Sequence, residues 1–180
     1  SVSDIVHRGG TILRSARCPE FTDIEFQHQA ADTLKAYGIE NLIVIGGDGS
    51  FRGAKALCDN CGVNVIGIPG TIDNDLAYTD YTLGFDTAVN TVLWAINALR
   101  DTMNSHDRVS LLEVMGRNCG DIALYSAVAG GVEYVLTPEI PYDLDEICAS
   151  IKFSQKRGKT SNMIILAEGA GNKEEICAKI

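Results

Sequence analysis

The sequence predicts an α/β protein with an open, mostly parallel sheet and helices on both faces. Five short runs rich in valine, isoleucine and leucine are almost continuously apolar, as strands covered on both faces are. Segments with helical spacing separate these runs, and this alternation is typical of βαβ units. Glycine-rich motifs follow three of the predicted strands, where open sheets of this kind bind ligands. Because the three motifs share this position, together they predict a ligand site more strongly than any one of them does.

The predicted strands cover residues 41–46, 63–68, 109–114, 132–136 and 162–167. The predicted helices cover residues 20–37, 50–60, 84–103, 119–130, 143–157 and 173–180. The helix over 84–103 is the clearest, because one stripe at helical spacing collects its apolar side chains Phe85, Val89, Val92, Leu93, Ile96 and Leu99. Gly38 is placed to end the first helix, and Asp143 is placed to cap the fifth.

The size and charge of the chain narrow its class. Its 180 residues are enough for one domain with a substantial core. A net charge of −9 argues against a nucleic acid or an anionic membrane as partner, because broad phosphate binding needs a basic face. No apolar run is long enough to cross a bilayer, and the first ten residues lack a signal pattern. We therefore expect a cytoplasmic protein.

Six cysteines are scattered through predicted helices and loops, which suits a reducing compartment better than a disulfide framework. Cys58 and Cys61 form a lone CxxC pair. A zinc site needs a second pair or histidines at suitable spacing, and none follows in the sequence. We interpret the pair as incidental thiols near a helix end, and we assign none of the three histidines to catalysis.

The motif IGGDGS at 45–50 closes the first strand and opens a helix. Its glycines remove the side chains that would keep a phosphate away from the backbone, and the helix start adds partial positive charge. Asp48 by itself repels phosphate, so it predicts a Mg²⁺ ion, which binds carboxylate and phosphate oxygens together. The alternative is a tight strand-to-helix turn in which Asp48 caps the helix.

The motif PGTIDND at 69–75 follows the second strand. Asp73 and Asp75 lie two residues apart, so in an extended loop they point the same way, with the Thr71 hydroxyl beside them. Two carboxylates and a hydroxyl can hold one alcohol of a sugar and remove its proton as it attacks a phosphoryl group. A polar turn is the alternative, but it gives no reason for Thr71.

The motif MGRNCG at 115–120 places Arg117 after the third strand. A guanidinium there suits a phosphate or a developing transition state, and a surface arginine in a turn is an equal alternative. Glu168 follows the last strand, where it can contact a sugar hydroxyl or cap a helix. Arg17 and Arg108 also lie next to element ends, where arginines are more often solvated.

The segments GGDGS, PGTIDND, GFDTA, EVMGR and AEG, in this order, resemble those of bacterial-type 6-phosphofructokinases. The likeness covers essentially the whole chain. It implies phosphofructokinase-like, Rossmann-type layers and a glycolytic, allosteric, tetrameric kinase that transfers the γ-phosphoryl group of ATP to the 1-hydroxyl of fructose 6-phosphate. The alternatives are a pyrophosphate-dependent relative, a lipid or NAD kinase that carries GGDG, and a non-catalytic regulatory subunit.

The resemblance implies a role for each matching residue. Asp73 is implied to accept the proton of the sugar hydroxyl, Thr71 to hold the transferring phosphoryl group, and Asp48 to bind Mg²⁺, aided by Asp75. The residues implied to contact ATP are Arg17, Cys18, Gly47, Asp48, Gly49 and Ser50. The residues implied to contact the sugar phosphate are Thr71, Ile72, Asp73, Asp75, Arg108, Met115, Gly116, Arg117 and Glu168. Arg108 is implied to act on the substrate of a neighbouring subunit, and Arg117 to take part in catalysis.

The resemblance also extends to an effector site and to the choice of donor. The residues implied to bind ADP or phosphoenolpyruvate between subunits are Arg100, Gly131, Val132, Glu133, Arg157 and Lys159. Thr160 stands where many members have another basic residue. Members that use pyrophosphate usually carry an aspartate at the position of Gly49 and a lysine at that of Gly70. Small residues at both positions leave room for adenosine and the α-phosphate, so the sequence favours ATP.

Two parts of the family pattern are missing from residues 1–180. They are the glycine-rich phosphate loop that precedes this region and the C-terminal segment whose histidine and arginines bind the sugar 6-phosphate. We therefore expect these residues to form a partial phosphofructokinase domain that is nearly inactive by itself, within a full-length protein that is active.

Overall fold

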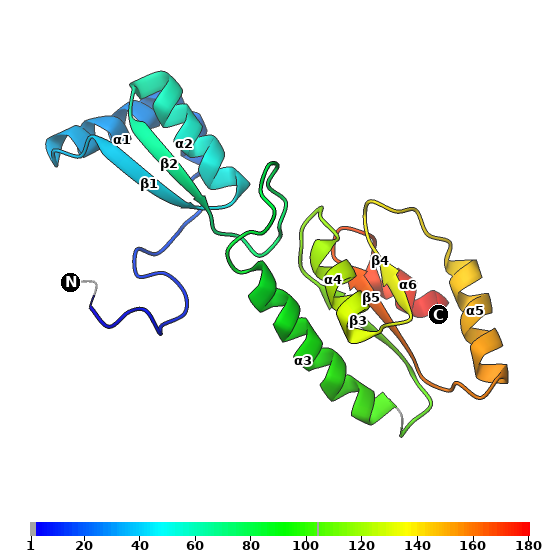
Figure 1. The fold of residues 1–180 in the computed structure, drawn as a ribbon. Coiled ribbons are helices and arrows are strands. Elements are labelled where there is room, and N and C mark those ends of the chain that lie inside the picture. Colours follow the sequence, from blue (N-terminus) through cyan, green and yellow to red (C-terminus); the bar gives the residue numbers. More distant parts are fainter. Residues whose placement is uncertain (1–2, 104) are drawn as a thin grey trace. The chain divides into compact units, whose positions relative to one another are not determined.

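The computed structural model describes residues 3–103 and 105–180, and it divides into two compact units (Figure 1). The first unit comprises the chain up to Val44 together with Phe51–Ile66. The second comprises Ile45–Ser50 and Gly67–Ile180. The boundaries fall within the strands β1 (Asn41–Gly46) and β2 (Asn64–Pro69) and near the start of the helix α2 (Asp48–Cys61).

The first unit packs α1 (Ile24–Ala36) and α2 against a sheet with the strand order β1-β2. The core between these elements centres on the buried side chains of Ala31, Leu57 and Val63. Along β1 the residues alternate between exposed and half-buried, because the two helices cover one face of the sheet. The predicted strand over 41–46 has the bounds that the sequence indicated, and the next strand begins one residue later than predicted.

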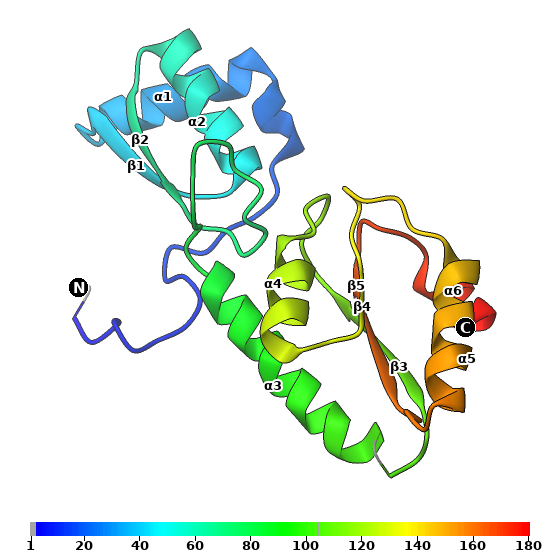
Figure 2. The same ribbon diagram turned by 45° about the vertical axis from the view of Figure 1, so that its right-hand side comes forward.

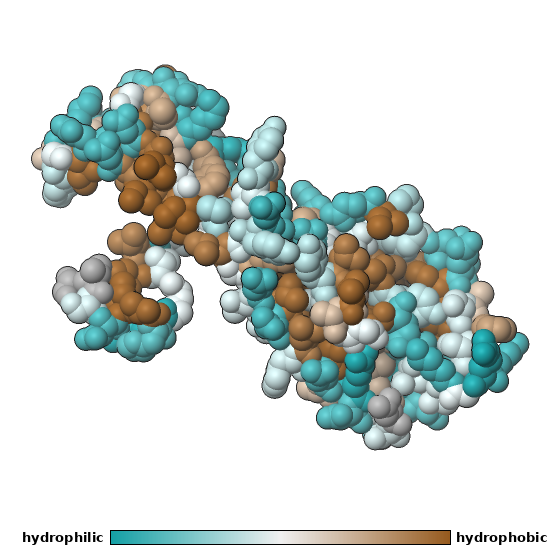
Figure 3. Space-filling view, viewed as in Figure 1, coloured by the Kyte–Doolittle hydropathy of each residue, from teal (hydrophilic) through white to brown (hydrophobic). Residues whose placement is uncertain are grey.

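The other face of these two strands carries apolar side chains that are exposed within the described residues. They are Ile43, Ile45 and Ile66. Figure 3 shows brown, hydrophobic atoms gathered over this part of the chain. The almost continuous apolar runs of β1 and β2 predicted strands with both faces covered. Within the described residues, one face of these two strands is covered.

The second unit contains a parallel sheet of three strands in the order β3-β5-β4. The strands are β3 (Val109–Val114), β4 (Tyr134–Leu136) and β5 (Asn162–Ala167). Val109 lies opposite Asn162 and Val114 lies opposite Ala167, so β3 and β5 pair along their whole length. The carboxyl ends of these parallel strands therefore meet at one edge of the sheet, as the sequence predicted.

Helices cover both faces of this second sheet (Figure 2). They are α3 (Phe85–Met103), α4 (Asp121–Gly130), α5 (Leu144–Lys156) and α6 (Lys173–Lys179). All six residues of β5 are buried, and they alternate: Met163 and Ile165 pack with α3 and α4, whereas Ile164 and Leu166 pack with α5 and α6. The predicted α/β class is confirmed, and the strands of the described residues form two sheets rather than one.

Local signals in the sequence set the ends of the helices. The carboxylate of Asp143 accepts a hydrogen bond of 2.7 Å from the N–H of Asp145 and caps α5, as predicted. Gly38 has a φ of +67° just past α1, a conformation that favours glycine. The predicted helix over 20–37 is divided, because Asp23 caps α1 and leaves Pro19–Thr22 as the short 3₁₀ helix η1.

The described residues contain no helix with both the length and the apolar character that a bilayer crossing requires.

Candidate active site

The IGGDGS and PGTIDND motifs lie side by side in the second unit. The N–H of Gly70 donates a hydrogen bond to the carbonyl of Gly46, with 3.0 Å between nitrogen and oxygen. A Cβ added at Gly47 would lie 3.3 Å from the Cβ of Thr71, so this glycine allows the two loops to approach closely. Asp48 is the first residue of α2 and is half-buried at the positive end of the helix. The loops predicted to bind phosphate and alcohol therefore meet.

The surroundings of Gly49 and Gly70 differ. A Cβ added at Gly49 would meet nothing within 4 Å, so space is open beside the first turn of α2. A Cβ added at Gly70 would lie 2.9 Å from Cγ2 of Ile45, so packing inside the protein already restricts this position. The steric argument for room beside the donor thus rests on Gly49, while Gly70 has a structural reason of its own.

Asp73 is the carboxylate whose surroundings are most unusual in this unit. Its own N–H donates a hydrogen bond of 3.2 Å to the hydroxyl of Thr71, which fixes the two residues relative to each other. Burial raises the pKa of Asp73, and the negative charges of Asp75 and Glu168 raise it further, while the positive charge of Arg117 opposes them. The structure therefore brings the PGTIDND, MGRNCG and AEG segments into one electrostatic environment.

Glu168 holds the loop that carries Arg117. Its Oε1 accepts hydrogen bonds from the N–H of Gly116 at 3.1 Å and from the N–H of Arg117 at 2.6 Å. Arg117 has a φ of +55° and Gly116 has a φ of +141°, so the loop has two consecutive residues in uncommon backbone conformations. The structure shows a backbone-capping role for Glu168, on a loop instead of a helix, and its predicted contact with a sugar hydroxyl stays a prediction.

Asn74, in the centre of PGTIDND, is a residue that the sequence reasoning did not assign. Its side-chain NH₂ donates a hydrogen bond of 2.8 Å to Oδ2 of Asp121 at the start of α4. Its Oδ1 accepts hydrogen bonds from the N–H of Thr82 at 3.0 Å and from the hydroxyl of the same residue at 3.4 Å. Asn74 has a φ of +57°, which asparagine tolerates better than most residues. It anchors the loop to Asp121 and Thr82, and its position between two aspartates was the available signal.

Three predicted residues lie elsewhere. Arg17 and Cys18 belong to the first unit, so their contact with ATP stays a prediction. The carbonyl of Arg108 accepts a hydrogen bond from Asn162 at the amino ends of β3 and β5. Since six strand residues span about 20 Å, Arg108 lies far from Arg117 in this chain. That position is compatible with the predicted role of Arg108 toward a neighbouring subunit.

A cavity of about 520 Å³ lies between α3 and β3. Ile72 and Met115, both predicted to contact substrate, are among its lining residues. Its other walls are largely apolar, with side chains such as those of Ala88, Val92 and Leu112. Phosphate groups require charged groups or N–H donors, which these apolar side chains do not offer.

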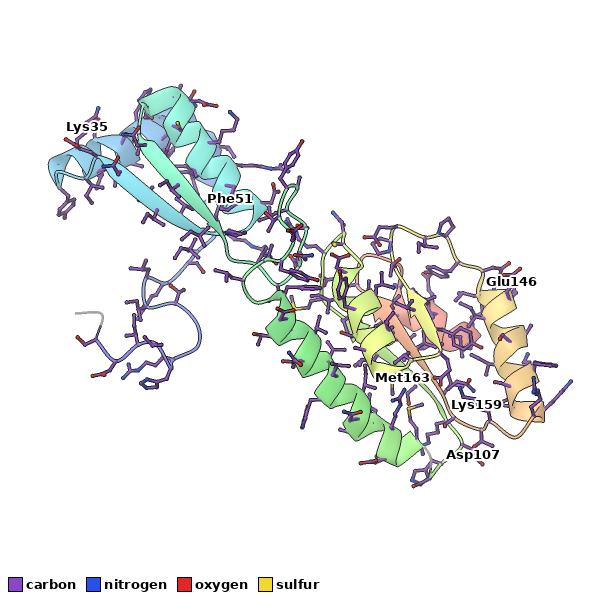
Figure 4. The ribbon with its side chains drawn as sticks, viewed as in Figure 1. Lys35, Phe51, Asp107, Glu146, Lys159 and Met163 are labelled. Atoms are coloured by element: carbon purple, nitrogen blue, oxygen red, sulfur yellow. The ribbon has the colours of Figure 1, made fainter. Side chains whose placement is uncertain are left out.

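The predicted effector residues meet at the opposite edge of the same sheet. The guanidinium of Arg100 donates a hydrogen bond of 2.6 Å to the carbonyl of Gly131, and Nζ of Lys159 lies 2.7 Å from Oε1 of Glu133. Although burial acts to raise it, the pKa of Glu133 is lowered by the hydrogen bonds from Lys159 and from the N–H of Met163. Lys159 and Met163, labelled in Figure 4, line the same cavity of about 270 Å³ with Arg100 and Glu133. Four of the six predicted residues thus form two directly bonded pairs, Arg100 with Gly131 and Lys159 with Glu133.

The other two predicted effector residues, Val132 and Arg157, make different contacts. Arg157 lies over the ring of Phe153, 5.7 Å from its centroid, which is a cation–π contact on α5 and just beyond it. Val132 is half-buried and packs against the core beside α3 and α4. Of the six predicted residues, Arg100, Glu133 and Lys159 line the cavity, and Gly131, Val132 and Arg157 are not among its lining residues.

No group of three histidine, cysteine or acidic side chains that could hold a metal forms within the described residues. Mg²⁺ in phosphoryl-transfer sites is commonly held by one or two carboxylates together with the phosphates of the substrate. Asp48 at the start of α2, beside flexible glycines, fits that kind of binding. The residues present are therefore suited to Mg²⁺ that arrives with a phosphate ligand.

The sequence comparisons point to one family. The family model described as phosphofructokinase matches residues 1–180. The chain is 62% identical over 180 residues to the ATP-dependent 6-phosphofructokinase of Clostridium tetani and 61% identical to that of Clostridium acetobutylicum. Each match covers all of this chain and 56% of the relative, so the chain spans about half the length of these proteins.

Solved structures show the same likeness. A phosphofructokinase structure from Saccharomyces cerevisiae matches with a TM-score of 0.79 and 34% identity, over 90% of this chain and 25% of that one. A pyrophosphate-dependent phosphofructokinase from Marinobacter aquaeolei matches with a TM-score of 0.71 and 26% identity, over 91% of this chain and 44% of that one. Sequence motifs, fold and comparisons agree that this chain belongs to the phosphofructokinase family.

Proposed function

We propose that the full-length protein is an ATP-dependent 6-phosphofructokinase, which converts fructose 6-phosphate and ATP into fructose 1,6-bisphosphate and ADP. The observation that carries this proposal is the environment of Asp73, a half-buried carboxylate with a raised pKa beside Thr71, Arg117 and Glu168. A raised pKa makes a carboxylate a stronger base, which suits it to accept the proton of an attacking alcohol. The names of the two clostridial relatives support ATP as the donor.

In this reaction Asp73 accepts the proton of the 1-hydroxyl as its oxygen attacks the γ-phosphorus of ATP. The bond between the γ-phosphorus and the bridging oxygen breaks, and ADP leaves. The hydroxyl of Thr71 and the guanidinium of Arg117 contact the transferring phosphoryl group and stabilise its charge in the transition state. The loop that Glu168 holds keeps Arg117 in place for this task.

Asp48 would hold Mg²⁺, which supplies positive charge to the phosphate oxygens of ATP when it is bound. The N–H groups from Gly47 to Ser50 contact the phosphate chain, and the open space beside Gly49 accommodates the rest of the nucleotide. Arg17 and Cys18 complete the contacts with ATP. Ile72, Asp75, Met115 and Gly116 contact the sugar phosphate.

The proposed protein is a cytoplasmic homotetramer under allosteric control. Six free cysteines support a reducing compartment. Arg108 reaches the sugar phosphate of a neighbouring subunit. ADP or phosphoenolpyruvate binds at the cavity of Arg100, Glu133 and Lys159. Gly131, Val132 and Arg157 complete the proposed effector site.

The experiment is a comparison of donors and acceptors with the full-length protein. We expect turnover with ATP, Mg²⁺ and fructose 6-phosphate, and little or none when pyrophosphate replaces ATP. A preference for pyrophosphate would show that pyrophosphate is the phosphoryl donor instead of ATP. Failure of fructose 6-phosphate to compete with a lipid or NAD acceptor would favour a kinase of the GGDG group instead.

Residues 1–180 form a partial domain in this proposal, and by themselves they turn over little or no substrate. They lack the upstream phosphate loop and the downstream arginines that the family pattern implies. A coupled assay of the 180-residue chain beside the full-length protein tests this statement. Substantial turnover by the shorter chain would mean that the site is complete without those segments.

A further inference from the structure

A contact between α1 and α2 gives the lone CxxC pair a feature that the sequence did not reveal. Sγ of Cys61, the last residue of α2, lies 3.6 Å from Nδ1 of His28 on α1. This distance is within hydrogen-bond reach for sulfur, and a thiol beside an imidazole is the arrangement that makes a cysteine nucleophilic. Cys58 lies three residues earlier on α2 and is exposed, whereas Cys61 is half-buried. The contact with His28 is made by Cys61.

The neighbouring residues hold this pair in position. Nδ2 of Asn60 donates a hydrogen bond of 2.7 Å to Oε1 of Gln27, so residues 27 and 60 join the helices directly beside 28 and 61. Gln27 is buried, and its Nε2 donates a hydrogen bond of 2.9 Å to the carbonyl of Phe21. Cys61 is half-buried against the core around Ala31 and Leu57. The thiol is therefore fixed by packing on one side while His28 stays exposed to solvent.

We propose that Cys61 is a site of covalent modification by soft electrophiles, with His28 as the acceptor of its proton. In the reaction with a haloacetamide, the sulfur of Cys61 forms a bond to the methylene carbon, the carbon–halogen bond breaks, and halide leaves. The thiol proton passes to Nδ1 of His28. This site lies in the first unit and does not depend on the proposed kinase activity.

The geometry predicts an order of reactivity that exposure alone would reverse. Exposure alone ranks Cys58, Cys18 and Cys177 ahead of Cys61, because those three are exposed and Cys61 is half-buried. A proton acceptor at 3.6 Å instead ranks Cys61 first. The comparison of the six thiols within one protein therefore separates the two explanations.

The experiment is timed alkylation of the folded chain with limiting iodoacetamide, read out for each cysteine by peptide mass spectrometry. We expect Cys61 to react faster than Cys58 and the other exposed thiols. The variant His28→Gln should slow Cys61 by roughly tenfold, less than the ~10²-fold or more that enzymatic general bases give. The rates at Cys18 and Cys177 should not change, because neither thiol has His28 as a partner.

The matched control is His106→Gln, which removes a histidine of the second unit and should leave all rates as they are. Circular dichroism and unchanged rates at the half-buried Cys119 and Cys148 exclude unfolding as the cause of any change in His28→Gln. A Cys61 rate that equals or falls below that of Cys58 would overturn the proposal. An unchanged Cys61 rate in folded His28→Gln would overturn it equally.

Discussion

At the carboxyl edge of the three-stranded sheet, Asp73 lies near two other carboxylates, whereas at the amino edge Glu133 is paired with Lys159. The pKa of Asp73 is raised and the pKa of Glu133 is lowered, although both side chains are partly buried. One edge thus keeps like charges close together, and the other neutralises its charge with a direct ion pair. We call the first the reactive edge, after the proposed role of Asp73, and the second the compensated edge.

Backbone strain separates the two edges less clearly than charge does. The carboxyl edge also contains Asn74 and Arg117 with positive φ, which costs about 1 kcal/mol or more at each residue. Hydrogen bonds from Asn74 and to Glu168 hold these conformations. At the amino edge, Gly131 has a positive φ without that cost, but Asp107, just before β3, has a φ of +49° and carries a similar cost.

The largest expected effect is at the reactive edge. In the full-length protein, Asp73→Ser should lower kcat by at least ~10²-fold with a modest change in ATP binding, because a general base is lost. The matched control is Asp80→Ser, an exposed aspartate in the following loop, which should keep kcat near that of the wild type. Steady-state kinetics with ATP and fructose 6-phosphate measure both variants. An unchanged kcat in Asp73→Ser would remove this carboxylate from the chemistry.

The second effect concerns the packing of the same edge. A Cβ at Gly120 would lie 2.5 Å from the Cβ of Thr137 and 2.6 Å from Oε2 of Glu139. Gly120→Ala should therefore lower the free energy of unfolding by about 1–3 kcal/mol, as overpacking does. Gly158→Ala at the amino edge would meet no atom within 4 Å, and only its φ of +89° opposes the change. Urea unfolding of the two variants should rank Gly120→Ala as the more destabilised, and the reverse order would contradict the packing described here.

The third effect is on pH dependence. The negative charge of Glu168 raises the pKa of Asp73, so Glu168→Gln should lower that pKa while its side-chain oxygen can still accept the two loop hydrogen bonds. Because Asp73 must be ionised to accept a proton, the acidic limb of kcat/KM should move to lower pH. The control is Glu139→Gln. Glu139 also accepts a backbone hydrogen bond, but its charge does not contribute to the raised pKa of Asp73. Movement of the acidic limb to higher pH would show that Glu168 does not act through Asp73.

The smallest effect is at the compensated edge. Glu133 has a lowered pKa in the folded protein, so its ion pair stabilises the fold above its ordinary pKa and loses that effect as pH falls through the lowered value. Lys159→Met should cost at most ~1 kcal/mol at neutral pH, since the lysine is half exposed. The difference from wild type should shrink in acid, whereas Lys152→Met on the exposed side of α5 should show little change at either pH. A difference that grows in acid would contradict the sign of the Glu133 shift.

The sequence by itself determined the elements and indicated the edge at which we propose that ligands bind. Apolar runs located the strands, Asp143 and Gly38 marked helix ends, and the glycine motifs indicated the carboxyl edge. These features depend on periodicity and on backbone preferences of single residues, which are local properties. Local signals could not predict that the strands would form two sheets, because strand pairing depends on contacts between distant segments.

Tertiary structure decided which side chains act together. Asn74 contacts Asp121, Glu168 holds the N–H of Arg117, and His28 lies beside Cys61, and each pair is separated by more than thirty residues in the chain. No spacing in the sequence encodes such contacts, because they arise only when packed helices and paired strands bring distant residues together. The chain thus revealed the chemistry available at each position, and the fold determined the partner that each group meets.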